Sequence, residues 1–327
     1  MPAARPMIGY HLSSEEHGPR QLVAFARRAE AAAFDYLQIS DHFHPWALTQ
    51  GQSPFVWGVL GALAEATQRV PILTAVTCPT IRIHPAIVAH AAATAAVQLP
   101  GRFMLGVGSG ERLNEAVLGD RWPASSVRLE MLGEAIEVMR ELWSGRLVTH
   151  QGRHYRVENA RLFTRPEAPP PVIFSAFGPD ALDLALEIEA DGLMSTKPDD
   201  ELPRRYRDGG GRGDVWGMTH VCVAASADDA LAIARRQWPN SAVPGLANLE
   251  LSIPEHIEAI GAAMGDEAFR DAFVLGDEPD AHVEEIRGYL DAGYDHVAVH
   301  QVGEDQETFF DLYEREVLPS LGSPPAS

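Results

Sequence analysis

Cysteine and long apolar runs are scarce in this chain of 327 residues. Its two cysteines, Cys78 and Cys222, stand far apart without neighbouring ligand residues, which argues against a disulfide framework and a cysteine-based zinc site. The N-terminal residues lack the charged and apolar segments of an export signal, and no apolar run approaches ~18 residues. We therefore expect a cytoplasmic protein without a membrane span.

Positive charge is also scarce. The chain has 26 basic and 46 acidic residues, a formal net charge of −20, and its only lysine is Lys197. A field of this sign repels phosphate backbones and anionic lipids. We expect neither nucleic acid nor membrane among the partners.

The sequence does contain a regular alternation of short apolar runs and longer stretches of helical periodicity, which is typical of βαβ units. Eight strands are expected, over residues 7–11, 36–40, 72–77, 103–107, 172–176, 193–196, 216–224 and 296–300. Helices are expected between them, over residues 20–33, 55–67, 85–98, 127–143, 179–190 and 228–238. Eight such units without two separable halves predict an α/β protein, a single closed (β/α)8 TIM barrel over residues 1–327.

Three segments depart from the alternation. Residues 147–150 and 154–157 predict a surface hairpin around a central glycine. Residues 239–276 are longer than one crossover needs and predict an insertion at the C-terminal mouth of the barrel, with one further helix at 254–264. Residues 322–327 are expected to form a flexible tail.

Reacting groups in barrel enzymes project from the C-terminal ends of strands. The second expected strand ends in Ser40-Asp41-His42-Phe43-His44-Pro45-Trp46. Imidazole titrates near neutrality, which makes His42 a candidate general base, with Asp41 orienting a ring or binding a cofactor. Two alternatives remain: hydrogen-bonded loop residues without chemistry, and a metal held by His42 and His44. The metal lacks companion ligands at suitable spacing, so no metal site is expected.

Two further strand ends combine glycine with polar groups. The fourth strand is followed by Gly108-Ser109-Gly110-Glu111, where glycines allow a flat ligand to approach the backbone and Glu111 would be costly unless solvated or functional. The glycine spacing does not match a dinucleotide fingerprint, and a simple tight turn is the alternative. The fifth strand ends in residues 176–179 before a helix, a place where barrels often hold phosphate. At the sixth strand end, Lys197 is either a ligand for an anionic group or a solvated side chain.

These strand ends resemble those of the luciferase-like flavin and deazaflavin oxidoreductases, and within them the branch of glucose-6-phosphate dehydrogenase-like enzymes that use coenzyme F420. The similarity extends from Gly9-Tyr10-His11 to Asp305-Gln306. It implies a barrel that holds F420, exchanges a hydride between C5 of the deazaflavin and an alcohol or carbonyl substrate, and forms a homodimer.

The resemblance also implies site residues. His42 would be the general base, Trp46 would line the reacting centre, and Glu111 would protonate or polarise the ring. Contacts to the cofactor would come from Asp41, Ser109, Gly110, Asn114, Ala176, Phe177 and Gly178, and from a cis peptide bond between Ala75 and Val76.

The chain departs from this branch in the phosphate pocket, where the resemblance calls for two lysines and an arginine. Lys197 is the only lysine, and Arg287 or His256 would have to compensate. Glucose 6-phosphate therefore fits poorly, and an apolar pocket is the alternative, with Trp57, Trp122 and Trp216 as its walls or as core residues. Two other functions remain open: an FMN-dependent monooxygenase and a non-catalytic cofactor-binding protein.

Overall fold

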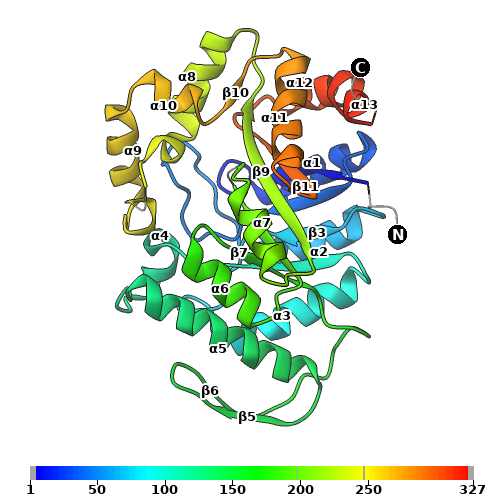
Figure 1. The fold of residues 1–327 in the computed structure, drawn as a ribbon, viewed down its shortest axis with the longest axis vertical. Coiled ribbons are helices and arrows are strands. Elements are labelled where there is room, and N and C mark those ends of the chain that lie inside the picture. Colours follow the sequence, from blue (N-terminus) through cyan, green and yellow to red (C-terminus); the bar gives the residue numbers. More distant parts are fainter. Residues whose placement is uncertain (1–4, 197, 246, 323–327) are drawn as a thin grey trace.

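The computed structural model describes residues 5–196, 198–245 and 247–322. Eight parallel strands close into a barrel, because β8 pairs with β9, β9 with β11, and β11 with β1 (Figure 1). The barrel strands are β1 (Met7–Leu12), β2 (Tyr36–Ile39), β3 (Ile72–Thr74), β4 (Phe103–Val107), β7 (Val172–Ser175), β8 (Gly192–Ser195), β9 (Asp214–Cys222) and β11 (His296–Gln301). The predicted (β/α)8 barrel is confirmed.

Helices surround the barrel and pack their apolar faces on it. They are α1 (Pro19–Ala31), α2 (Val56–Ala66), α3 (Pro85–Gln98), α5 (Ser125–Trp143), α6 (Pro179–Glu187), α7 (Glu201–Asp208), α8 (Ala227–Gln237), α11 (Pro279–Asp291) and α12 (Gln306–Leu312), which continues through a π-helical turn (Tyr313–Val317) into α13 (Leu318–Leu321). Proline begins α1, α3, α6 and α11, where its missing N–H costs no hydrogen bond. No described helix is both long and apolar enough to span a bilayer.

The barrel interior is a packed core. Alternate side chains of each strand point inward, and Tyr36, Ile173 and Trp216 form an apolar cluster there with Leu73, Met194 and Ala298. The rings of Tyr36 and Trp216 meet edge to face at 4.9 Å. Because this layer is filled, space for a ligand has to come from the loops at the strand ends.

The surface hairpin differs in its bounds from the prediction. The hairpin strands are β5 (Val148–Gln151) and β6 (Arg156–Ala160), so the second strand begins later than predicted. The reason is that the amides of His154 and Tyr155 donate to the carboxylate of Glu134 on α5 instead of to the strand ladder. Figure 1 shows this hairpin at one end of the molecule, beyond α5.

The predicted insertion contains more structure than a single helix. It comprises two 3-10 turns (Pro239–Ala242 and Ala247–Leu249), α9 (Pro254–Ala263), α10 (Asp266–Arg270) and β10 (Val274–Leu275). β10 pairs in parallel with β9 and so extends the sheet beside the barrel. The prediction of only one helix was wrong, because α10 and β10 are too short to give a periodic pattern. Most of the predicted tail lies outside the described residues.

Candidate active site

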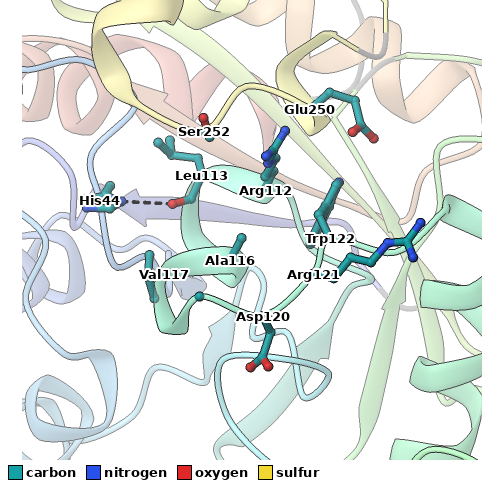
Figure 2. A pocket seen from close by; sticks show the side chains of 11 residues that line it. His44, Arg112, Leu113, Ala116, Val117, Asp120, Arg121, Trp122, Glu250 and Ser252 are labelled. Carbon is teal, nitrogen blue, oxygen red and sulfur yellow. Dashed lines mark hydrogen bonds between the residues drawn. The ribbon is translucent and has the colours of Figure 1, made fainter.

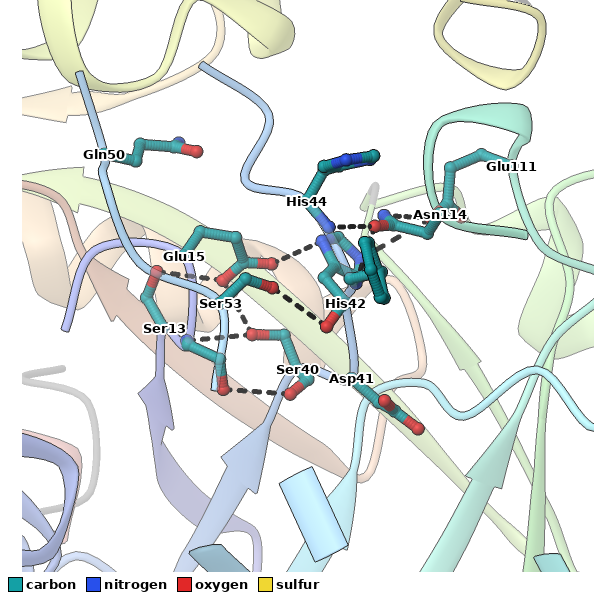
Figure 3. Close-up of polar contacts among 12 residues, drawn as sticks. Ser13, Glu15, Ser40, Asp41, His42, His44, Gln50, Ser53, Glu111 and Asn114 are labelled. Carbon is teal, nitrogen blue, oxygen red and sulfur yellow. Dashed lines mark hydrogen bonds and ion pairs between the residues drawn. The ribbon is translucent and has the colours of Figure 1, made fainter. Parts of the chain in front are cut away.

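His42 lies in the loop directly after β2, at the C-terminal mouth of the barrel (Figure 3). Its Nδ1 atom lies 2.7 Å from Oε1 of Glu15, which follows β1, and its Nε2 atom lies 3.8 Å from Oε1 of Glu111, which follows β4. The Glu15 side chain is 2% exposed and that of Glu111 is 13% exposed. One imidazole therefore lies between two carboxylates, with Nε2 on the side of the less buried one, Glu111.

Glu15 is a site residue that the sequence analysis missed. Its Oε2 atom accepts hydrogen bonds from the hydroxyls of Ser40, at 2.7 Å, and Ser13, at 3.1 Å. Ser14 then donates its amide to the Ser40 hydroxyl and its own hydroxyl to the Ser40 carbonyl. These bonds fasten the loop after β1 to the end of β2 and hold Glu15 beside the imidazole of His42.

The electrostatics of this pair oppose the effect of burial. Burial disfavours a charged imidazole, but Glu15 and then Glu111 outweigh it and raise the pKa of His42 to about 9. Burial likewise disfavours an ionised Glu15, yet His42 and His11 hold the pKa of that carboxyl below its ordinary value. At pH 7 the site therefore contains an imidazolium paired with a buried carboxylate.

Trp46 and Asn114 complete the surroundings of His42. The Trp46 indole meets the imidazole edge to face, with ring centroids 5.0 Å apart. The Asn114 side chain donates to Oε1 of Glu111 at 2.6 Å and accepts, at 2.7 Å each, from the two backbone amides that follow His42. The structure thus brings the three predicted catalytic residues, His42, Trp46 and Glu111, into one cluster.

Arg82 is a second residue that the sequence analysis missed. Its guanidinium donates to Asp41 at 2.9 Å and to Glu115 at 3.3 Å, and all three side chains are nearly or fully buried. The other oxygen of Asp41 accepts from the hydroxyl of Thr77. The oxygens of Asp41 thus accept from protein groups and fix the loop that carries His42, while the predicted contact of Asp41 with a cofactor stays a prediction.

Small residues form the side of the mouth at the ends of β3 and β4. The Ala75–Val76 peptide bond is cis, and both residues are half-buried, as is Ser109. A Cβ atom on Gly108 would lie 2.7 Å from Cγ2 of Val76, and Gly110 has a φ of +80°. The left-handed backbone of Gly110 favours glycine, and the small side chains on this side of the mouth are what a flat ligand would need to approach the main chain.

The end of β7 is similarly open. Ala176 is buried, Phe177 is 62% exposed, and Gly178 precedes the first turn of α6. Apart from the glycine and its chain neighbours, no heavy atom of the described residues lies within 4 Å of the point where a Cβ of Gly178 would be. The free amides of the α6 N-terminus are thus accessible to an anionic group.

Other predicted residues do not join this cluster. Lys197 lies outside the described residues. Arg287 is on α11, where its guanidinium donates to the carbonyl of Ser320 near the chain's C-terminal end, and the structure does not bring it to the mouth. Trp216 is part of the barrel interior, and Trp57 on α2 packs against Phe103. Trp216 is therefore a core residue, whereas the half-buried Trp57 lines a separate pocket between α2 and α3 with Ile87 and His90.

A pocket of about 510 Å³ opens beside the loop that carries His42 (Figure 2). His44, whose Nδ1 atom lies 2.9 Å from the carbonyl of Leu113, is on one side of it, and Trp122 is on the other. The guanidinium of Arg128 stacks on the Trp122 ring at 4.1 Å. His42 does not line this pocket, which therefore adjoins the catalytic cluster without containing it.

A closed (β/α)8 barrel with an imidazole, an indole and paired carboxylates at its C-terminal mouth has the architecture of a barrel enzyme. A family model described as luciferase-like monooxygenase matches residues 5–296. The chain belongs to this family of enzymes, which confirms the resemblance seen at the strand ends.

Individual proteins and solved structures are also similar to this chain. Two F420-dependent glucose-6-phosphate dehydrogenases, from Microbacterium testaceum and Nakamurella multipartita, are each 37% identical to this chain. Each alignment covers 96% of this chain, and it covers 97% of the first protein and 96% of the second. The structure of an F420-dependent secondary alcohol dehydrogenase in complex with an F420-acetone adduct has a TM-score of 0.91 at 29% identity, over 98% of this chain and 100% of the other. The F420-dependent tetrahydromethanopterin reductase from Methanopyrus kandleri shares the fold, with a TM-score of 0.76 at 22% identity, over 97% of this chain and 100% of the other.

Proposed function

We propose that the protein is an F420-dependent oxidoreductase that interconverts a neutral secondary alcohol and its carbonyl compound, with His42 moving the proton. The observation that carries this proposal is the position of His42 between Glu15 and Glu111, with Nε2 on the side of the less buried carboxylate. The names of the relatives support it, because they are F420-dependent and the structure of one is a complex with an F420-acetone adduct.

The residues present fit a deazaflavin. Ala75, Val76, Gly108 and Gly110 would lie against its flat ring, and the amides at Gly178 and the start of α6 would hold its phosphate. When bound, the deazaflavin supplies the carbon that accepts or returns the hydride. The protein's own task is to bind, to orient and to transfer the proton.

His42 can transfer that proton in either direction. In alcohol oxidation, Nε2 takes the hydroxyl proton as the hydride leaves the carbinol carbon, and Glu15 stabilises the imidazolium that forms. In carbonyl reduction, the imidazolium returns the proton to the carbonyl oxygen. Because the pKa of His42 is raised to about 9, neutral pH favours the proton-donating form, and alcohol oxidation requires a higher pH.

The charge of the mouth argues for a neutral substrate. Glu15 and Glu111 flank His42, and the buried Arg82 is already neutralised by Asp41 and Glu115. A phosphate group beside Glu15 and Glu111 would meet repulsion, and the arginines of the adjoining pocket, Arg112 and Arg121, lie outside the cluster around His42. We therefore expect glucose 6-phosphate to be a poor substrate.

Cofactor titration followed by turnover tests the proposal. We expect quenching of F420 fluorescence at micromolar protein, no binding of FMN, and loss of the visible absorbance of oxidised F420 when a secondary alcohol is added at pH 9. Binding of FMN with no affinity for F420 would overturn the proposal and favour the monooxygenase.

The proposed enzyme is a homodimer. Phe55 and Ile87 are each 60% exposed, and Val97 is 42% exposed, although all three belong to the α2 and α3 region of the barrel surface. Exposed apolar side chains on neighbouring helices favour contact with a second copy. Light scattering should give twice the 35.6 kDa chain mass, and Ile87→Glu should return it to the monomer value.

A further inference from the structure

A second group of ionisable side chains lies at the mouth without a role in the proposed proton transfer. It consists of Glu16, His300 and His220, which we call the buried histidine chain. Nε2 of His300 lies 2.9 Å from Oε2 of Glu16, and Nδ1 of His300 lies 2.9 Å from Nδ1 of His220. The two histidines are register partners on the neighbouring strands β11 and β9.

The buried histidine chain extends from a buried carboxylate, Glu16, to a partly exposed ring, His220. The side chain of His300 is fully buried and that of Glu16 is 4% exposed, and Oε1 of Glu16 also accepts from the amide of Gly303. His220 is half-buried, and no described residue hydrogen-bonds to its Nε2 atom. Nε2 of His220 is thus the free end of an otherwise satisfied hydrogen-bonded chain.

Aromatic rings hold this free end in place. The Trp238 ring meets the His300 ring edge to face, with centroids 4.4 Å apart, and its centroid lies 5.8 Å from that of the His220 ring. Phe273 lies 5.7 Å from the His220 ring on another side. An imidazole packed in this way has little rotational freedom, so its Nε2 atom keeps a fixed direction.

The buried histidine chain has two arrangements with both imidazoles neutral, and they differ by one bound proton. An Nδ1 to Nδ1 contact requires one ring to donate and the other to accept. With Glu16 ionised, His300 carries its proton on Nε2 and accepts from His220, whose Nε2 is then a bare acceptor. When the group takes up one proton at Nε2 of His220, the other two protons shift along it, from His220 to Nδ1 of His300 and from Nε2 of His300 to Glu16. Glu16 is then protonated, and Nε2 of His220 is a donor. The free end can therefore pair with a hydroxyl or with a carbonyl oxygen.

His220 and His42 are connected through aromatic rings. Trp46, whose ring meets that of His42, packs on the apolar cluster that contains Trp238 and Phe273, the two rings beside His220. Strand alternation places His220 on the same face of β9 as Trp216 and Met218, which belong to the interior cluster. The free Nε2 atom therefore belongs to the mouth that also contains His42.

We propose that Nε2 of His220 binds a second, neutral oxygen of the substrate, which makes diols and hydroxycarbonyl compounds the preferred substrate class. This inference rests on the proposed function, because it takes the reacting oxygen to be at His42. Burial, followed by the neighbouring histidine, lowers the pKa of His220 well below its ordinary value, so its ring offers no positive charge to a phosphate.

Two substitutions separate the free end of the chain from its inner contact. His220→Asn keeps a polar atom near the Nδ1 position and loses the Nε2 position, whereas His220→Gln reaches the Nε2 position. The readout is the ratio of kcat/KM for 2,3-butanediol to kcat/KM for 2-butanol with F420. We expect a ratio of about five or more in the wild type, a ratio near one in His220→Asn and recovery in His220→Gln, since one hydrogen bond contributes ~0.5–1.5 kcal/mol.

A wild-type ratio near one, or an unchanged ratio in His220→Asn, would overturn the inference. His90→Asn, an exposed histidine on α3, is the matched control and should keep the wild-type ratio. Thermal unfolding of all variants identifies any that do not fold, and His220→Gln then carries the test.

A binding measurement distinguishes this inference from the proposed function. In protein labelled with ¹⁵N-histidine, the Nε2 resonance that disappears in His220→Asn should shift with 2,3-butanediol and not with 2-butanol. If the resonance shifts but no alcohol is oxidised, the proposed function fails while the binding site stands. If 2-butanol is oxidised but the resonance ignores the diol, the inference fails alone.

Discussion

The two sides of the barrel mouth are built from opposite kinds of residue. The ends of β3, β4 and β7 carry small residues, such as the buried Gly108 and the more open Gly178, and only Glu111 after β4 reaches across to His42. Ionisable groups that are largely buried, such as Glu15, His42 and His300, lie on the other side. They belong to the C-terminal ends of β1, β2, β9 and β11 or to the loops that follow them. The difference indicates a division of labour, because a flat cofactor needs close access to the backbone and a moving proton needs paired charges.

The largest effect is expected on the charged side. His42→Ala should lower kcat for alcohol oxidation by ~10²-fold or more, since a general base usually contributes 10² to 10⁴. F420 affinity should stay near the wild-type value, because the small-residue side is untouched. Steady-state kinetics and fluorescence titration check both, and a loss of only a few-fold would contradict the assignment of the base.

Arg82→Met should have the next largest effect, on stability. It leaves the buried carboxylates of Asp41 and Glu115 without their cation, which costs ~3–5 kcal/mol of unfolding free energy. Arg207→Met is the matched control. Arg207 and its ion-pair partner Asp295 have side chains that are 42% and 37% exposed, so solvent screens the pair. We expect its loss to lower the unfolding free energy by less than ~1 kcal/mol. Urea unfolding compares them, and equal losses would show that the buried cluster is not a special support.

Glu15→Gln should move a pH profile. Removing the carboxylate lowers the pKa of His42 from about 9 toward its ordinary value near ~6.5, so the rise of kcat/KM for alcohol oxidation shifts to lower pH. The raised pKa of His42 also means that its ion pair stabilises the fold fully below ~6.5 and that this stability is lost as the pH rises through about 9. An unmoved profile would exclude Glu15 as the partner of the base.

Gly108→Ala should have the smallest effect and act on the other side alone. Its methyl group would lie 2.7 Å from Val76, which must shift, and such overpacking costs ~1–3 kcal/mol. We expect F420 to bind about tenfold more weakly, with the pH profile unchanged. A changed profile with unchanged affinity would break the division between the two sides.

Sequence patterns carried most of the fold but only part of the site. The barrel strands and main helices have strong periodicity, and His42, Trp46 and Glu111 stand directly after strands. Glu15 also follows a strand, yet Ser13-Ser14-Glu15-Glu16-His17 has the composition of a solvated loop, and only the bonds to Ser40 reveal that it is buried. Applying the strand-end rule to the first strand would have found it.

Long-range pairings could not be predicted. Arg82 acts through Asp41 and Glu115, and nothing in the spacing of these residues indicates that they meet. His220 and His300 are brought together by strand register, which sequence alone leaves open. Arg287 shows the converse, since a charge with the right chemistry sits on an outer helix and bonds to Ser320.

The side-chain amide of Asn114 bears on how the substrate range of such an enzyme can change. Asn114 joins Glu111 to the two backbone amides after His42, so an acid from one loop and an imidazole from another are fastened into a single unit. The described residues of the segment 239–276 make none of these hydrogen bonds, but they do pack on Trp46 and Leu113. Exchange of this segment would therefore reshape the space around the Trp46 indole, while Asn114 keeps Glu111 and the loop of His42 in mutual alignment.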